Sequence, residues 1–147
     1  MKSPNLPCDI KTEKTLLGCC IIDKTAFDRI SDKVTFSDFY EPRHTMIFRA
    51  MIGIAASGTR IDMITVRDWL NTENMLKQVG DREAIIALTD DVWSAANCER
   101  YAEIVKEHSR RRHLIQSLSG ICDDAIACED PDELCARADI AITTNRS

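Results

Sequence analysis

The architecture of this chain follows from residues 95–127, which read AANCERYAEIVKEHSRRRHLIQSLSGICDDAIA. This segment contains no proline, and Gly120 is its only glycine, so little in it interrupts helical hydrogen bonding. Ser94 comes directly before it and is a residue type that favours a helix start. We therefore expect one continuous helix from Ser94 to about Ala127, which would be about 50 Å long.

A second helix start follows within a few residues. Asp130 is a capping residue, Pro131 occupies a first helical position, and Glu133 stands at the third position. This pattern predicts a last helix from Pro131 to about Thr144, which would be about 21 Å long. A connection of about three residues makes two helices fold back on each other, so residues 94–147 are expected to form an antiparallel helical hairpin.

Shorter helical patterns precede the long one. Apolar residues recur at helical spacing over residues 10–22 and in the segments that follow, up to about Leu88. Caps, a first-turn proline and glycine stops are expected at Asp23, Pro42, Gly58, Asp62 and Gly80. Core positions are expected for the aromatic residues Phe36, Phe39, Tyr40, Trp69 and Trp93. The predicted fold class is all-α, with a compact multi-helix head at residues 1–93 and the helical hairpin, for dimerisation, at residues 94–147.

The composition fits a globular protein and argues against several classes of function. Apolar residues make up 44% of the 147 residues, and no segment approaches the roughly 18 apolar residues that a membrane helix needs. No cationic region followed by an apolar run opens the sequence, so a cytoplasmic location and no membrane partner are expected. The net charge of −5 is unlike the basic field of most autonomous nucleic-acid-binding proteins, so no direct nucleic-acid partner is expected.

No catalytic, cofactor or metal site is predicted. The seven cysteines include no C-x-x-C pair and no nearby histidine at zinc spacing, so we expect reduced thiols that pack as small apolar residues, with metal binding the less favoured alternative. His44 has no acidic or thiol partner at a mechanistic spacing and is interpreted as structural. The basic cluster at residues 110–112 could contact phosphates, but its acidic neighbours favour pairing with carboxylates within or between hairpins.

Four blocks of sequence occur in order between residues 7 and 126. They are TEKTLLG at 12–18, DFYEPRHTMIF at 38–48, GTRIDMIT at 58–65 and SAANCERYAEIV at 94–105. In order and spacing they resemble the blocks AE-x-x-[VL]-LG, DFY-x-x-x-H-x-x-IF, G-x-x-[IV]-D-x-x-T and SAAN-x-x-x-YA-x-IV of the N-terminal domain of DnaB-type bacterial replicative helicases. The chain departs from that pattern at Lys11, where an acidic residue is common, and at Asp81, where a second glycine is usual.

The resemblance implies a non-catalytic collar domain. In this family, hairpins pair between subunits into dimers, three dimers form a collar above the motor ring, and a DnaG-type primase docks there, with a helicase loader as a further candidate partner. The family's motor is a RecA-like ATPase that would hold ATP and magnesium. None of the five glycines here opens a G-x-x-x-x-G-K-[ST] phosphate loop, so no cofactor is expected in this chain. The alternative is a free-standing adaptor or inhibitor of a helicase with the same fold, in a bacterial or phage-infected bacterial cell.

The long helix carries more apolar positions than one returning helix can cover, which favours a two-fold contact between hairpins. Because the last helix spans less than half of the long one, the middle of the long helix is expected to be uncovered. We expect the contact to centre near Leu118, with arginines at its rim meeting acidic side chains of the partner. The residues assigned to this interface are Tyr101, Val105, His108, Arg111, Arg112, Ile115, Leu118 and Cys122.

Overall fold

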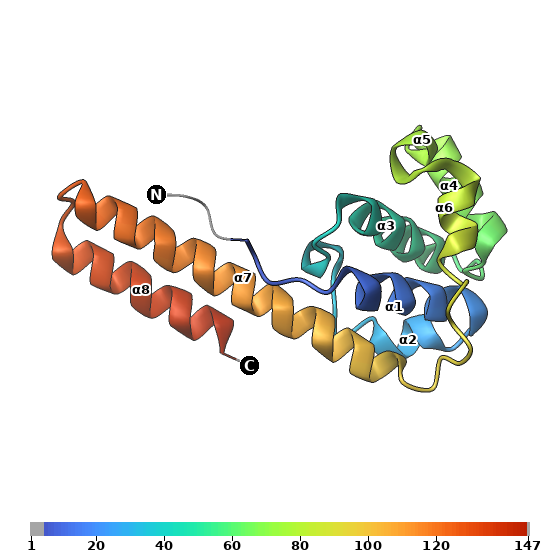
Figure 1. Ribbon diagram of the computed structural model, residues 1–147, viewed down its shortest axis with the longest axis horizontal. Helices are drawn as coiled ribbons and strands as arrows, with labels where there is room; N and C mark the ends of the chain where they lie inside the picture. The colour runs from blue at the N-terminus through green and yellow to red at the C-terminus, as the bar shows by residue number, and fades with distance from the viewer. Residues whose placement is uncertain (1–4, 147) are drawn as a thin grey trace. The chain divides into compact units, whose positions relative to one another are not determined.

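The computed structural model describes residues 5–146, which form eight α-helices and one 3₁₀ turn with no strand among them (Figure 1). The predicted all-α fold is confirmed. The elements are α1 (Ile10–Ile22), α2 (Ala26–Ile30), η1 (Phe36–Asp38), α3 (Pro42–Ala56), α4 (Met63–Thr72), α5 (Leu76–Val79), α6 (Asp81–Ala87), α7 (Cys98–Ile126) and α8 (Pro131–Asn145). Within residues 5–146, none of the helices combines the length and the apolar character that crossing a membrane requires.

The chain divides into two compact units. The head unit is Cys8–Lys106, and the hairpin unit is residues 107–146 together with residues 5–7. The expected division fell between residues 93 and 94, whereas the structural division lies within α7. Packing explains the difference, because Cys98, Ala102 and Val105 in the first turns of α7 are buried in the core of the head unit.

The core of the head unit is built around α1 and α3, which contact each other. Leu16 and Leu17 of α1 are completely buried in it. The ring of Phe48, from α3, lies 5.7 Å from the ring of Phe27 and 5.0 Å from that of Phe39, measured between centroids. These aromatic contacts join α2, α3 and the segment after η1 into one core.

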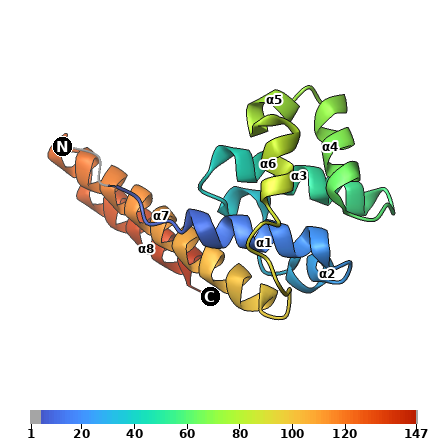
Figure 2. The same cartoon turned by 45° about the vertical axis from the view of Figure 1, so that its right-hand side comes forward.

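The predicted antiparallel hairpin is confirmed. The connection between α7 and α8 includes Cys128, whose φ is +64°. From there α8 runs back beside the C-terminal part of α7, as Figures 1 and 2 show.

Several predicted helix boundaries are confirmed. The carboxylate of Asp62 accepts the backbone N–H of Thr65 at 2.8 Å and caps α4, and Asp130 caps α8 in the same manner. Gly58 follows α3 with a φ of +78°, and Gly80 separates α5 from α6 with a φ of +103°. In both glycines the left-handed backbone ends a helix without the strain that a Cβ would bring.

Two expected caps differ from the structure. Asp23 does not cap α2 directly; its Oδ1 accepts the backbone N–H and the hydroxyl of Thr25, each at 2.8 Å, and Thr25 is the capping position. Ser94 does not start α7, which begins at Cys98. Its hydroxyl oxygen instead accepts the N–H of Ala96 at 3.1 Å, in the loop before the helix. Both side chains therefore stabilise turns that precede helices.

The expected aromatic core is correct only in part. Phe39 is buried and Trp69 packs against the core, but Phe36 and Tyr40 are exposed. Trp93 lies in the loop between α6 and α7 and is 94% exposed. Phe36 lies in a single 3₁₀ turn and the other two lie in loops, where no α-helical periodicity directs side chains inward, so the apolar character of these residues did not determine their burial.

Candidate interaction surfaces

Two arginines join α8 to α7: Arg137, in the middle of α8, contacts the last turn of α7, and Arg110, on α7, contacts the C-terminal end of α8. Near the turn, Nη2 of Arg137 lies 2.7 Å from Oδ2 of Asp124, and this hydrogen bond raises the pKa of Arg137. At the other end, Nε and Nη2 of Arg110 donate to the carbonyl oxygen of Asn145 at 3.0 and 2.6 Å. The side chain of Leu134 is buried in the hairpin. α8 therefore accompanies α7 from about residue 124 back to residue 110.

One face of α7 is turned away from α8. The α7 residues that bond to α8 or line the groove beside it are Arg110, His113, Ser117, Ile121 and Asp124. Arg111, Ile115, Leu118 and Cys122 are spaced by four, three and four residues, and share a second face about 130° away at about 100° per residue. Leu118 is 38% exposed, Arg111 and Cys122 are exposed, and Ile115 is half-buried. We call these four residues the hairpin stripe.

The hairpin stripe is uncovered for a different reason from the one expected. The sequence argument held that α8 is too short to reach the middle of α7. In the structure α8 runs beside the very part of α7 that carries Ile115, Leu118 and Cys122. A helix that returns after a short turn must accompany the end of its predecessor, so among the described residues the stripe is left without α8 because of the face that it occupies on α7.

Two residues assigned to the interface belong to the head unit instead. Val105 is buried in its core, and Tyr101 is half-buried against the same core. The expected stripe was drawn along the whole of α7, but the part of this helix before residue 107 packs in the head unit. Tyr101 and Val105 therefore do not belong to the hairpin stripe.

The basic residues of α7 have different environments. Arg111 is exposed and has Nη2 4.0 Å from Oε2 of Glu107, one turn earlier. His108 is half-buried, with Nδ1 3.3 Å from Nη1 of Arg111. Arg112 is buried, and its Nη1 donates to the carbonyl oxygen of Pro7 at 2.9 Å. Arg112 therefore does not lie at an exposed rim as expected, because its side chain is buried within the hairpin unit.

Three further isoleucines of the hairpin unit are exposed, Ile126, Ile140 and Ile142. Ile126 follows Cys122 by four residues and so extends the hairpin stripe toward the turn. Ile140 lines a hollow of about 430 Å³ between α7 and α8. The helical spacing along the sequence already places Ile126 on the same face as Cys122.

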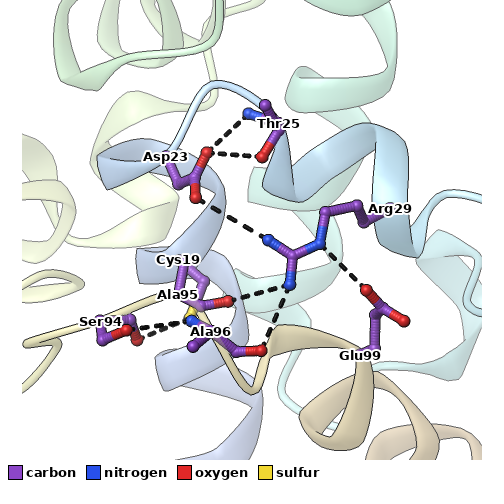
Figure 3. Close-up of polar contacts among 8 residues, drawn as sticks. All are labelled: Cys19, Asp23, Thr25, Arg29, Ser94, Ala95, Ala96 and Glu99. Carbon is purple, nitrogen blue, oxygen red and sulfur yellow. Dashed lines mark hydrogen bonds and ion pairs between the residues drawn. The ribbon is translucent and has the colours of Figure 1, made fainter.

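Arg29 of α2 fixes the loop that leads into α7 (Figure 3). Its Nε lies 3.0 Å from Oε1 of Glu99, and its Nη2 donates to the carbonyl oxygens of Ala95 and Ala96 at 3.4 and 3.3 Å. Nη1 lies 3.8 Å from Oδ2 of Asp23. The hydrogen bond to Glu99 raises the pKa of Arg29. One guanidinium thus holds the start of α7 to α2 within the head unit.

A buried carboxylate of α1 was not predicted from the sequence. Oε1 of Glu13 lies 3.0 Å from Nδ1 of His44, so the expectation that His44 lacks an acidic partner is wrong. Oε2 accepts the N–H of Tyr40 at 2.8 Å, and Oε1 accepts that of Glu41 at 3.3 Å. Glu13 precedes Leu17 by four residues and so lies on the apolar face of α1, which was the available signal. The pair holds the start of α3 to α1, which is a structural role for His44.

Asp38 of η1 is a second buried carboxylate. Its oxygens lie 3.3 and 3.2 Å from Nζ of Lys106, and Oδ2 accepts the N–H of Thr35 at 2.8 Å. Within residues 5–146, no three histidine, cysteine or acidic side chains are grouped closely enough to hold a metal ion. Through its bonds to Lys106 and Thr35, Asp38 holds η1 to α7 within the head unit.

The sequence of the chain matches the family model described as DnaB-like helicase N terminal domain over residues 5–107. The chain belongs to this family. "Replicative DNA helicase DnaB" of Geobacillus stearothermophilus is 36% identical over 124 residues, which are 84% of this chain and 27% of that protein. "Replicative DNA helicase DnaC" of Bacillus subtilis is 32% identical over 127 residues, 86% of this chain and 28% of that protein. The chain thus spans little more than a quarter of the length of these relatives.

A solved structure supports the same assignment. The crystal structure of the N-terminal domain of DnaB helicase from Mycobacterium tuberculosis matches with a TM-score of 0.89 and 26% identity, covering 95% of this chain and 99% of that one. The DnaB family model ends at residue 107, one residue after the end of the head unit, while the structural likeness extends over most of the hairpin unit. The family predicted from the four sequence blocks is confirmed.

Proposed function

We propose that this DnaB-like domain is the collar part of a replicative helicase, that it pairs with a second copy through the hairpin stripe, and that it docks a DnaG-type primase. Its relatives are named as replicative DNA helicases, and it aligns with about a quarter of their length. The sequence contains no phosphate loop for ATP. In this proposal the domain pairs with further copies and binds the primase in the bacterial cytoplasm, and a motor domain carries out catalysis.

The observation that carries the pairing is the hairpin stripe. Ile115, Leu118 and Cys122 form an apolar row on the side of α7 that α8 does not contact, and Arg111 lies at its end. Burying a leucine or isoleucine contributes about 1.5 to 3 kcal/mol, so the rows of two copies can together support a dimer. Because both copies present the same row, a two-fold arrangement satisfies both at once. Three such dimers would complete the collar of a full helicase.

The mass of the purified chain tests the pairing directly. Light scattering or sedimentation at tens of micromolar should give the mass of a dimer, falling toward that of a monomer on dilution. A chain that stays monomeric throughout this range would contradict the hairpin contact.

Primase docking rests on family membership more than on any single residue. The C-terminal domain of the cognate primase should bind the assembled domain with a dissociation constant of about 1 μM or below, measured by calorimetry. Absence of heat and of any change in mass at high concentration would argue against docking. The same pure protein should hydrolyse no ATP, and ATPase activity that copurifies with it would contradict the non-catalytic role.

A further inference from the structure

A hollow opens on the surface of the head unit between α4 and α6, two helices that contact each other and are labelled in Figure 2. Its volume is about 250 Å³, and its lining residues are Met63, Ile64, Arg67, Arg82, Ile85 and Ile86. We call it the α4–α6 groove. It lies wholly within the head unit, so it is separate from the hairpin stripe.

The groove presents apolar side chains to solvent. Ile64 is 60% exposed and Ile86 is 51% exposed, while Ile85 is buried beneath them. Exposed large apolar side chains are ordinary when they are scattered, but two of them beside one hollow with a polar rim are typical of a binding surface. The apolar part of the groove can therefore receive apolar side chains of another molecule.

Each exposed isoleucine has an arginine on the same helical face. Arg67 follows Ile64 by three residues on α4, and Arg82 precedes Ile86 by four on α6. Among the residues that the structure describes, Arg67 bonds only to the neighbouring carboxylate of Asp68, at 3.1 and 3.2 Å. Arg82 makes no hydrogen bond or ion pair with any residue that the structure describes. Within residues 5–146, the lining of the groove thus holds two guanidinium groups and no carboxylate, although Asp68, Asp81 and Glu83 are their neighbours in sequence.

We propose that the α4–α6 groove binds an amphipathic helix of a partner protein, with apolar residues one turn apart and carboxylates at its edge. Helices commonly bind with their apolar face in such grooves, and a carboxylate is the group that a guanidinium pairs with best. The hollow is smaller than the roughly 300 to 1,000 Å³ of small-molecule pockets, which disfavours a metabolite. It is lined by no aromatic side chain among the described residues, which disfavours stacked bases. The inference does not depend on hairpin pairing or primase docking.

Two synthetic helical peptides test the groove on the full chain. Both carry leucines one turn apart on one face; the first has glutamates at the edges of that face, and the second has lysines there. Methyl NMR spectra of the isoleucines should show Ile64 and Ile86 shifting on titration with the glutamate peptide, with much weaker shifts for the lysine peptide. No shift with the glutamate peptide, or equal shifts with both peptides, would overturn the proposal.

Variants test the arginines at the rim of the groove and its apolar side chains separately. Arg82→Glu should weaken binding of the glutamate peptide about tenfold and favour the lysine peptide, whereas Arg100→Glu, at an exposed site on α7, should change neither. The double change Ile64→Ser with Ile86→Ser should remove binding of the glutamate peptide. Both isoleucines are exposed, so the circular dichroism spectrum and melting temperature should be kept. Unchanged binding in the double variant, or equal effects of Arg82→Glu and Arg100→Glu, would place the peptide elsewhere and overturn the proposal.

Discussion

Oε1 of Glu13 lies 3.0 Å from Nδ1 of His44, and both side chains are buried where α1 meets the start of α3. The same carboxylate accepts the backbone N–H groups of Tyr40 and Glu41. One side chain thus satisfies three polar groups that come from a segment about thirty residues later. The positions of η1 and α3 against α1 depend on it.

Removal of this carboxylate should strongly destabilise the head unit. Glu13→Ala leaves His44 and two backbone N–H groups buried without an acceptor, so we expect a loss of about 3 to 5 kcal/mol in the free energy of unfolding. Glu13→Gln, which keeps an amide oxygen and similar volume, should lose less. Urea denaturation measures both, with Glu83→Ala, exposed on α6, as a control that should change stability by about 0.5 kcal/mol at most. If Glu13→Ala lowered the free energy of unfolding no more than the control does, the hydrogen bonds of Glu13 would not stabilise the head unit.

The cysteines should fall into two classes of reactivity. Cys122, Cys128 and Cys135 are exposed on the hairpin unit, whereas Cys19 and Cys20 are buried in the head unit, where burial raises the pKa of both thiols. Since only the thiolate reacts, a brief treatment with iodoacetamide at pH 8 of the chain diluted to a monomer should label the exposed three, and the buried two only after unfolding. Mass spectrometry of digested protein identifies the labelled sites. Rapid labelling of Cys19 in the folded chain would contradict its burial.

Stability should also fall at alkaline pH. Burial raises the pKa of Cys19 from its ordinary value of 9.0 to about 11. The folded chain therefore keeps this proton at a pH where the unfolded chain has lost it, so the contribution of Cys19 is fully present below pH 9 and is lost as the pH rises toward 11. Urea denaturation midpoints between pH 8 and 11 measure the fall. Cys19→Ala should reduce the slope without abolishing it, because burial also raises the pKa of Cys20, and an unchanged slope in that variant would exclude a contribution from Cys19.

Two helical glycines should respond in opposite directions to the same change. A Cβ on Gly18 of α1 would overlap the carbonyl oxygen of Leu88 and lie 2.7 Å from Cγ2 of Val92, so Gly18→Ala should cost about 1 to 3 kcal/mol. A Cβ on Gly120 of α7 would meet no side chain or neighbouring element among the described residues, so Gly120→Ala should stabilise α7 by up to about 1 kcal/mol. Thermal melting followed by circular dichroism compares them. If the two variants had equal melting temperatures, the close approach of Gly18 to Leu88 and Val92 would not be required for the stability of the head unit.

Local sequence signals predicted the helices well. Asp62 and Asp130 cap the helices that follow them, and Pro42 and Pro131 are first helical residues, because capping and proline geometry depend on a few adjacent residues. The helix start predicted at Ser94 is wrong, because a serine stabilises a turn as readily as a helix start. Four residues of loop therefore precede α7 where helix was expected.

Contacts between distant segments were not predictable from the same signals. The pairing of Glu13 with His44 joins positions 31 residues apart, and spacing along one helix cannot reveal it. Periodicity likewise identified the hairpin stripe on α7 but could not show which stripe α8 would cover. The side chains of α7 that α8 contacts became clear only from the bonds of Arg110 and Arg137. The interface residues near Leu118 thus stay a prediction, whereas Tyr101 and Val105, before residue 107, pack in the head unit.

Leu118 is the residue on which the proposed dimer depends most directly. It lies in the middle of the hairpin stripe, on the face turned away from α8, and is 38% exposed in the single chain. Leu118→Asp would place an unpaired carboxylate in the apolar contact between two copies, at a cost large enough to separate them. Because the side chain is already partly in solvent, the fold itself should change little. Gln116→Asp adds the same charge on another, exposed face of α7 and is the matched control.

Sedimentation and circular dichroism at tens of micromolar measure the two effects together. We expect wild type and Gln116→Asp to sediment as dimers and Leu118→Asp as a monomer, all three with the same helical spectrum. A Leu118→Asp chain that remains dimeric would show that the contact lies elsewhere on the molecule. A Leu118→Asp chain that unfolds would show that Leu118 belongs to the interior of the hairpin unit, and the hairpin stripe could then not be the surface on which two copies meet.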